Sequence, residues 1–245
     1  MQFLYHERAG DCQLEMSSDG FSHIIKARRA KLDSTLQVRN LRDSMLHTYK
    51  VVDIQKKSAL LEHISQEEIL GAQCSHLHLL WAVIDPKVIE KTLPMLNELG
   101  IPRISFFYAE FSQRHFRLNL DRMQKILIAS SQQCGRAQLM NLEILRDFDE
   151  VCRHYAPFYA FDFGGKDIAK HNPFLKRTDS TPVRIMLGAE GGFSQKERQQ
   201  FAQIITLHDT LRAPILRSES ASVFLASLAR LHTTQTTSQR SIEWK

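Results

Sequence analysis

From Leu77 onward, short apolar runs alternate with longer amphipathic segments, and this alternation limits the folds open to the chain. The run from Leu77 to Ile84 is almost continuously apolar, which is typical of a strand buried on both faces of a sheet. Pro86 then begins a predicted helix that stops at Gly100. Because each helix in such an alternation must cover one face of the sheet, the sequence predicts an α/β fold with a parallel sheet.

The same rhythm continues toward the end of the chain. In sheets of this kind ligands bind at the carboxyl ends of the strands, so the loops after the strands are where we expect a site. The polar tail from Thr233 to Lys245 has no periodicity and is expected to be frayed. The further predicted elements are strands at 104–108, 158–163 and 183–187 and helices at 121–133, 195–205 and 218–231.

The first part of the chain has a different pattern, with short strand-like stretches and one basic helical stretch around residues 22–30. The strand-like stretches are 2–5, 35–38, 45–54 and 59–64, which together predict a small β-barrel or sandwich. Residues 65–75 are polar enough to form a linker. We therefore expect two domains, at residues 1–70 and 71–245.

The chain carries a formal net charge of +5, which suits a polyanionic partner. Basic residues gather in two places, and either group alone is better explained by a solvated helix face. Both in one chain favour contact with RNA phosphates. The first group is Lys26, Arg28, Arg29 and Lys31, and the second contains Arg114 and Arg117 near His115, Arg122 and Lys125.

Cysteine spacing and hydropathy limit the class of protein further. Cys12, Cys74, Cys134 and Cys152 form no C-x-x-C pair and have no histidine at zinc-ligand spacing, so we expect reduced structural thiols and no metal. No apolar run reaches the roughly 18 residues that a membrane span needs, and the start lacks the pattern of a signal peptide. The expected location is the cytoplasm, with no membrane partner.

The strongest local motif is a glycine-rich turn at residues 187–197, directly after a predicted strand and before a predicted helix. Ser194 and Glu197 have the spacing of a capping box, which fixes the start of the helix. The glycines then lie in the turn, where they permit positive φ or a close approach of a ligand. A tight turn without a ligand is the alternative. The motif is neither a phosphate-binding Walker loop nor a dinucleotide fingerprint, because its spacing differs from both.

Two further motifs accompany this turn. Ala213 to Ala221 is again a loop that runs into a helix, and Glu219 in its first turn is favoured by the helix dipole even if it only caps the helix. The third motif, Gln132-Gln133-Cys134-Gly135-Arg136, ends an earlier helix.

The order of these three motifs resembles the family of 16S ribosomal RNA uracil-N3 methyltransferases (RsmE type) of the SPOUT superfamily. The family shows a Glu-Gln-Ser/Cys-Gly-Arg stretch, a Gly-Pro-Glu-Gly-Gly-Phe-Ser turn and an Ile-Leu-Arg-Thr-Glu-Thr-Ala segment. The resemblance extends more weakly to residues 112–126 and to the basic stretch at 23–29. Ala189 replaces the family's proline, Gln132 a glutamate, and Arg212 and Pro214 a glycine and an arginine.

The resemblance implies a PUA-like β-barrel followed by a SPOUT domain with a C-terminal trefoil knot. It further implies a homodimer that acts on 16S rRNA in the small ribosomal subunit. The knot would bind S-adenosyl-L-methionine, mostly through backbone groups. Carried over by motif, the cofactor-binding residues are Phe163, Leu187, Gly188, Gly191, Gly192, Leu211, Ile215, Leu216 and Ser218.

Methylation of uracil N3 needs removal of its proton, so a base or a charge-stabilising cation is required. Our hypothesis is that Arg136 supplies this cation or holds the target phosphate, and that Arg217 assists. Glu190 and Glu219 are candidate bases that could equally be caps or dimer contacts. Two alternatives remain open from the sequence: another SPOUT enzyme acting on a ribose hydroxyl or a tRNA base, and an RNA-binding relative without catalysis.

Overall fold

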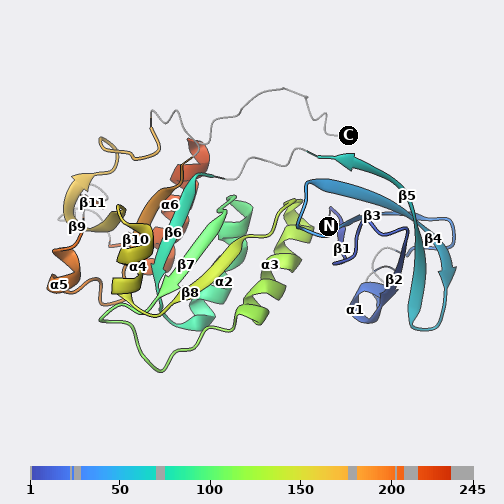
Figure 1. Cartoon of the computed structure of the whole chain (residues 1–245), viewed down its shortest axis with the longest axis horizontal. Coiled ribbons are helices and arrows are strands. Elements are labelled where there is room, and N and C mark those ends of the chain that lie inside the picture. The colour runs from blue at the N-terminus through green and yellow to red at the C-terminus, as the bar shows by residue number, and fades with distance from the viewer. Residues whose placement is uncertain are drawn as a thin grey trace.

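The computed structural model describes residues 2–22, 24, 29–69, 75–175, 181–201, 203–206 and 215–232. Its strands form two separate sheets, which lie at opposite ends of the molecule (Figure 1). Each sheet has a hydrophobic core of its own, and a small third cluster lies between them. The protein therefore has a mixed α/β fold, as the sequence predicts.

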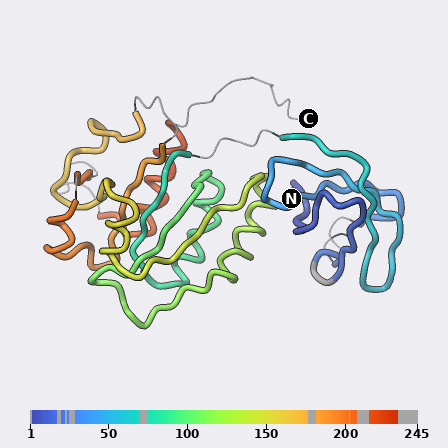
Figure 2. The backbone as a smooth tube through the Cα atoms, in the orientation of Figure 1, coloured from blue at the N-terminus to red at the C-terminus, as the bar shows by residue number. Residues whose placement is uncertain are grey.

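The first sheet has five strands in the order β1-β3-β4-β5-β2. Its central pair, β4 and β5, is antiparallel and long, and it curls with two shifts of register (Figure 2). Alternate residues of β2 and β3 point into a core that contains Leu14, Val38 and Leu61. The elements of this part are β1 (Leu4–Tyr5), β2 (Gln13–Ser17), α1 (Ser18–Ser22), β3 (Thr35–Arg39), β4 (Met45–Ile54) and β5 (Ser58–Glu68).

The second sheet has six strands, and every adjacent pair in it is parallel. Its order is β11-β9-β10-β6-β7-β8, so β6 lies near the middle, and all of its side chains are buried. The strands are β6 (Leu77–Ala82), β7 (Arg103–Phe107), β8 (Asn141–Leu145), β9 (Tyr159–Asp167), β10 (Val183–Leu187) and β11 (Gln203–Thr206). The helices are α2 (Pro86–Glu98), α3 (Leu120–Cys134), α4 (Phe148–Tyr155), α5 (Gln195–Arg198) and α6 (Ser218–Leu231).

Helices cover both faces of this sheet. On one face Trp81 of β6 contacts Ser218 of α6, and α2 packs against both α6 and α3. The helix α4 lies on the other face (Figure 1), where its last residue, Tyr155, packs against His78 of β6. None of the helices among the described residues has the length and hydropathy needed to cross a bilayer.

Two expectations about the elements are wrong. The helix predicted at 195–205 ends at Arg198, and residues 203–206 form β11 at the edge of the sheet. Ile204 and Ile205 are β-branched and pair with β9, so tertiary pairing overrides the helical period. The predicted linker at 65–75 is strand as far as Glu68, because residues 65–68 pair with the start of β4. The strands β2 and β8 and the helix α4 were not predicted. Residues 70–74 and most of the basic stretch at 22–30 lie outside the described residues.

The two sheets are joined through the start of the chain and the end of α3. The side chain of Gln132 accepts a hydrogen bond from Tyr5 N at 2.8 Å, and its carbonyl oxygen accepts one from Gln2 N at 2.7 Å. Phe3, Leu41 and Leu46 form the buried cluster between the sheets, packed against residues that include Ile128 of α3. The Gln132 motif therefore fixes β1 to the second sheet.

Candidate functional site

The glycine-rich turn after β10 is closed by its own backbone. Gly192 N donates a hydrogen bond to the carbonyl oxygen of Ala189 at 2.9 Å, and Gly192 has a φ of 73°, which favours glycine. A Cβ atom on Gly188 would lie 3.0 Å from the backbone of Gly192. One on Gly191 would lie 3.1 Å from Phe111. The glycines are therefore required by close packing within the turn and against a neighbouring loop.

Ser218 ties this turn to the centre of the sheet. Its hydroxyl donates to the carbonyl oxygen of Gly188 at 2.8 Å and accepts a hydrogen bond from Trp81 Nε1, also at 2.8 Å. Because Ser218 is the first residue of α6, one hydroxyl joins the turn, a helix start and β6. The glycine-rich turn and the segment that begins α6 thus meet at a single oxygen atom.

A pocket of about 500 Å³ opens beside this junction, at the carboxyl end of β10 and next to residues 161–163 of β9. This volume is within the range of small-molecule sites. Of the predicted cofactor-binding residues, those that line it are Phe163, Leu187, Gly188, Gly192, Ile215, Leu216 and Ser218. The predicted catalytic residues Glu190, Arg217 and Glu219 line it as well. Gly191 packs against Phe111 instead, and Leu211, Arg212 and Pro214 lie outside the described residues.

Asp162 is a pocket residue that the sequence analysis missed. Its carboxylate, only 4% exposed, forms an ion pair with Arg198 Nε at 2.6 Å. The hydrogen bond from Arg198 to Asp162 raises the pKa of the guanidinium, which therefore keeps its positive charge. The sequence signal that could have identified Asp162 was its position near the end of a predicted strand, directly before Phe163. Among the described lining residues, Asp162, Glu190 and Glu219 supply three carboxylates and Arg217 supplies one guanidinium.

Glu197 links the glycine turn to the loop after β7. The predicted capping box is confirmed: Ser194 N donates to Glu197 Oε2 at 2.8 Å, and Glu197 N donates to Ser194 Oγ. The other carboxylate oxygen, Oε1, accepts a hydrogen bond from Glu110 N at 2.9 Å. This carboxylate therefore holds two loops together at the same edge of the sheet.

Arg136 lies away from the pocket, just after the end of α3. Its guanidinium donates hydrogen bonds to the carbonyl oxygens of Gln138 and Asn97, and Asn97 is in the last turn of α2. Gly135 caps α3 with a φ of 83°. Within one subunit, Arg136 thus binds helix-terminal carbonyl groups and does not reach the pocket.

The predicted RNA-binding residues fall in two regions. Arg29 and Lys31 are exposed between α1 and β3, whereas Lys26 and Arg28 lie outside the described residues. Arg114 and Arg117 are exposed in the loop between β7 and α3, in the part of the chain that forms the second sheet.

The described cysteines form no disulfide, and burial raises the pKa of the Cys152 thiol to about 11. No cluster of metal-ligating side chains occurs among the described residues.

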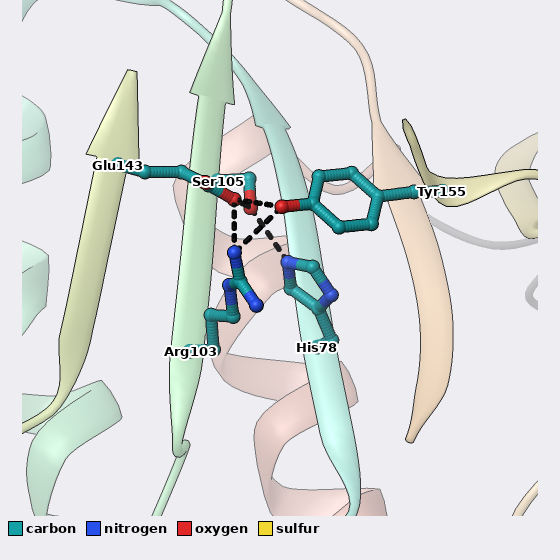
Figure 3. Close-up of polar contacts among 5 residues, drawn as sticks. All are labelled: His78, Arg103, Ser105, Glu143 and Tyr155. Carbon is teal, nitrogen blue, oxygen red and sulfur yellow. Dashed lines mark hydrogen bonds and ion pairs between the residues drawn. The ribbon is translucent and has the colours of Figure 1, made fainter. Parts of the chain in front are cut away.

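A second polar cluster lies near the amino ends of the strands (Figure 3). Glu143 Oε1 accepts hydrogen bonds from Ser105, Tyr155 and Arg103, and His78 Nε2 lies 2.6 Å from Ser105 Oγ. Because the Ser105 proton goes to Glu143, His78 must donate to Ser105, which is the reverse of an activated serine nucleophile. The cluster therefore fastens β6, β7, β8 and α4 together and offers no catalytic serine.

Comparisons with known proteins agree with this architecture. The family model for the RNA methyltransferase domain matches residues 72–230. A Helicobacter pylori protein named ribosomal RNA small subunit methyltransferase E is 38% identical over 237 residues, which cover 94% of this chain and all of that protein.

Two solved structures have the same fold. A methyltransferase from Legionella pneumophila with bound S-adenosylmethionine is 20% identical, with a TM-score of 0.76 over 94% of this chain and 97% of that one. A ribosomal RNA small subunit methyltransferase E from Neisseria gonorrhoeae, also bound to S-adenosylmethionine, gives a TM-score of 0.73 at 20% identity, over 94% and 96% of the two chains. At these identities the likeness concerns the fold.

Proposed function

Because this chain belongs to the ribosomal RNA small subunit methyltransferase E family, we propose that it methylates N3 of a uridine in 16S rRNA. It is an rRNA methyltransferase that uses S-adenosyl-L-methionine. The choice of uridine N3 rests on the motif resemblance in the sequence and on the chemistry of the pocket.

The observation that carries the proposal is the fit between this cofactor and the pocket. S-adenosylmethionine carries a sulfonium, an ammonium group and one carboxylate, so its net charge is positive. The carboxylates of Glu190 and Glu219 complement this charge, whereas Asp162 is already paired with Arg198. Leu187, Leu216 and Phe161 offer apolar surface for the adenine ring. Gly188 and Gly192 line the pocket without side chains, so a ligand can approach their backbone closely.

Uracil N3 is protonated at neutral pH, and its lone pair becomes available only when that proton leaves. Glu190 and Glu219 are the candidate bases, and Arg217 is positioned at the same wall to stabilise negative charge on the uracil oxygens. In a Watson–Crick pair N3 is hidden, so the target uridine must be unpaired or flipped out. The site then has to accept a single nucleotide beside the cofactor.

Arg136 enters the proposal through a second subunit. It lies away from the pocket of its own chain, so its assigned role in catalysis requires a homodimer in which it reaches the pocket of the partner. The proposal further includes a PUA-like domain at residues 1–70, a knotted SPOUT domain at 71–245 and action in the cytoplasm. Lys26, Arg28, Arg29 and Lys31 of the first domain would hold rRNA phosphates, with an affinity that falls as salt rises.

Purified small ribosomal subunits and naked 16S rRNA, each incubated with the protein and S-adenosylmethionine, test the proposal. Nucleoside analysis should detect N3-methyluridine, and mapping should place it at one position. A methylated ribose, or modification of tRNA alone, would identify a different RNA methyltransferase. No transfer to any RNA, despite intact cofactor binding in calorimetry, would refute the enzymatic proposal.

A further inference from the structure

A second hollow lies at the same edge of the sheet as the cofactor pocket. It has a volume of about 590 Å³ and follows the ends of β7 and β8. Because both strands are parallel to β10, their carboxyl ends share an edge with the glycine turn. Its lining residues, which we call the arginine groove, are Tyr108, Arg114, Arg117, Ile144, Leu145, Arg146 and Glu150.

The groove carries positive charge that the protein leaves partly uncompensated. Arg146 pairs with Asp147 at 2.7 Å, and Glu150 accepts a hydrogen bond from Arg146 N. Among the described residues, neither Arg114 nor Arg117 forms an ion pair with a carboxylate. Arg117 instead donates to the carbonyl oxygens of Arg114 and Phe116. Two exposed guanidinium groups thus remain available to an anionic ligand.

An aromatic ring is fixed in the same groove. The hydroxyl of Tyr108 donates to the carbonyl oxygen of Phe116 at 2.9 Å, which sets the orientation of the ring. The guanidinium of Arg114 lies 5.9 Å from the ring centroid. Ile144 and Leu145 add apolar surface. Tyrosine rings and arginine planes are the surfaces on which unpaired bases stack, and adjacent cations bind the phosphates between them.

The groove and the cofactor pocket are connected by direct contacts. Glu110 N binds the carboxylate of Glu197, and Phe111 packs against Gly191 in the glycine turn. Ser112 Oγ donates to the carbonyl oxygen of Val83 at 2.9 Å, which anchors the loop to the end of β6. The loop that carries Arg114 and Arg117 is therefore held against the turn that lines the pocket.

We propose that the arginine groove binds unpaired RNA nucleotides that flank the target uridine, with Arg114 and Arg117 on phosphates and Tyr108 stacked on a base. The inference rests on the proposed function, because it assumes that the nucleotide beside the cofactor belongs to an RNA strand. A single strand fits better than a duplex, since stacking on Tyr108 requires an exposed base face. The groove thus selects a locally unpaired substrate.

Fluorescence anisotropy with a labelled single-stranded oligouridylate of roughly ten nucleotides tests this inference. The double variant Arg114→Gln/Arg117→Gln should bind about tenfold or more weakly, and its salt slope should be shallower by about 1.4, as expected for two lost phosphate contacts to a single strand. Lys87→Gln/Lys91→Gln, which removes two exposed charges from α2, is the matched control and should bind like the unmodified protein. Unchanged S-adenosylmethionine binding in calorimetry verifies that the double variant is folded.

The stacking contact has its own pair of variants. Tyr108→Phe keeps the stacking ring but loses the hydrogen bond to Phe116, so it should retain most of the affinity. Tyr108→Leu should weaken binding about tenfold with little change of the salt slope. Equal binding by the double arginine variant and the lysine control would overturn the proposal. A preference for a duplex of the same length would overturn it as well. If the double arginine variant bound the oligonucleotide normally but no longer bound assembled ribosomal subunits, the groove would be assigned to a protein partner instead.

These outcomes are separable from failure of the proposed function. Formation of N3-methyluridine by the unmodified protein, together with oligonucleotide binding that ignores Arg114 and Arg117, refutes the groove alone. Arginine-dependent binding without any N3-methyluridine refutes the proposed reaction alone.

Discussion

Glu197 Oε1 accepts a hydrogen bond from Glu110 N at 2.9 Å, although the two residues are 87 positions apart. The side chain is buried, and its other oxygen accepts a hydrogen bond from Ser194 N. One carboxylate therefore sets the distance between the glycine-rich turn and the loop of the arginine groove.

Replacing Glu197 with glutamine should separate these loops. Glutamine has one oxygen acceptor, so one of the two backbone N–H groups loses its partner, at a cost of about 1–3 kcal/mol in unfolding free energy. Urea denaturation and S-adenosylmethionine calorimetry should show lower stability and weaker binding. Glu98→Gln, an exposed change on α2, is the control, and identical behaviour of the two variants would contradict the bridging role.

Gly188→Ala should abolish cofactor binding. The added methyl group would lie 3.0 Å from the backbone of Gly192, so the turn must shift. Gly20→Ala meets only the flexible end of Met16 and should leave calorimetric binding unchanged. Cofactor binding by the Gly188 variant at normal affinity would exclude the turn from the cofactor site.

Ser218→Ala should destabilise the protein and weaken cofactor binding. It leaves Trp81 Nε1 and the Gly188 carbonyl oxygen without their shared partner, a loss of about 1–3 kcal/mol. The control on the same helix is Ser227→Ala, because Ser227 bonds only the carbonyl oxygen of Val223. Thermal melts with and without S-adenosylmethionine measure both effects, and parallel behaviour of the two serine variants would argue against the junction.

His78 should make stability depend on pH. Burial, followed by the charge of Arg103, lowers its pKa to about 4 from the model-peptide value of 6.5. The folded state therefore binds fewer protons than the unfolded state between these values, and stability is full above pH 6.5 and falls as the pH drops toward 4. The loss approaches about 3 kcal/mol. Urea denaturation across this range should show a flatter profile for His78→Gln, and an unchanged profile would assign the effect to other groups.

Arg136→Ala should reduce methylation at least about a hundredfold while cofactor affinity stays within about twofold, if its charge acts on the target in a partner's pocket. Arg136→Lys keeps the charge and should retain part of the turnover. If Arg136→Ala lowered stability and cofactor affinity as much as turnover, the role of Arg136 would instead be structural, through its hydrogen bond to the carbonyl oxygen of Asn97 at the end of α2.

Strong local patterns predicted much of the fold. Several predicted strand and helix bounds, among them Met45–Ile54, Val183–Leu187 and Ser218–Leu231, are those observed, because the apolar period is clear in these segments. The helix α4 was missed although Asp147 and Glu150 have N-cap spacing, and Asp147 does cap it. β11 could not be predicted, since its state depends on pairing with β9.

The site was predicted in part for a similar reason. Glycines and a capping box are local signals, so the turn and most pocket residues were found. The bond between Glu110 and Glu197, the ion pair of Asp162 with Arg198 and the groove at Tyr108 join distant segments. Such contacts follow from the order of strands in the sheet, which the sequence pattern does not specify.

The hydrogen bonds from Tyr5 and Gln2 to Gln132 lock the curled sheet onto α3 at two points. These contacts hold the first sheet at a defined distance from the second. Under the proposed function, an RNA bound by Arg29 and Lys31 would therefore have to present its target base at that distance, and uridines elsewhere along the same molecule would lie out of reach of the methyl donor.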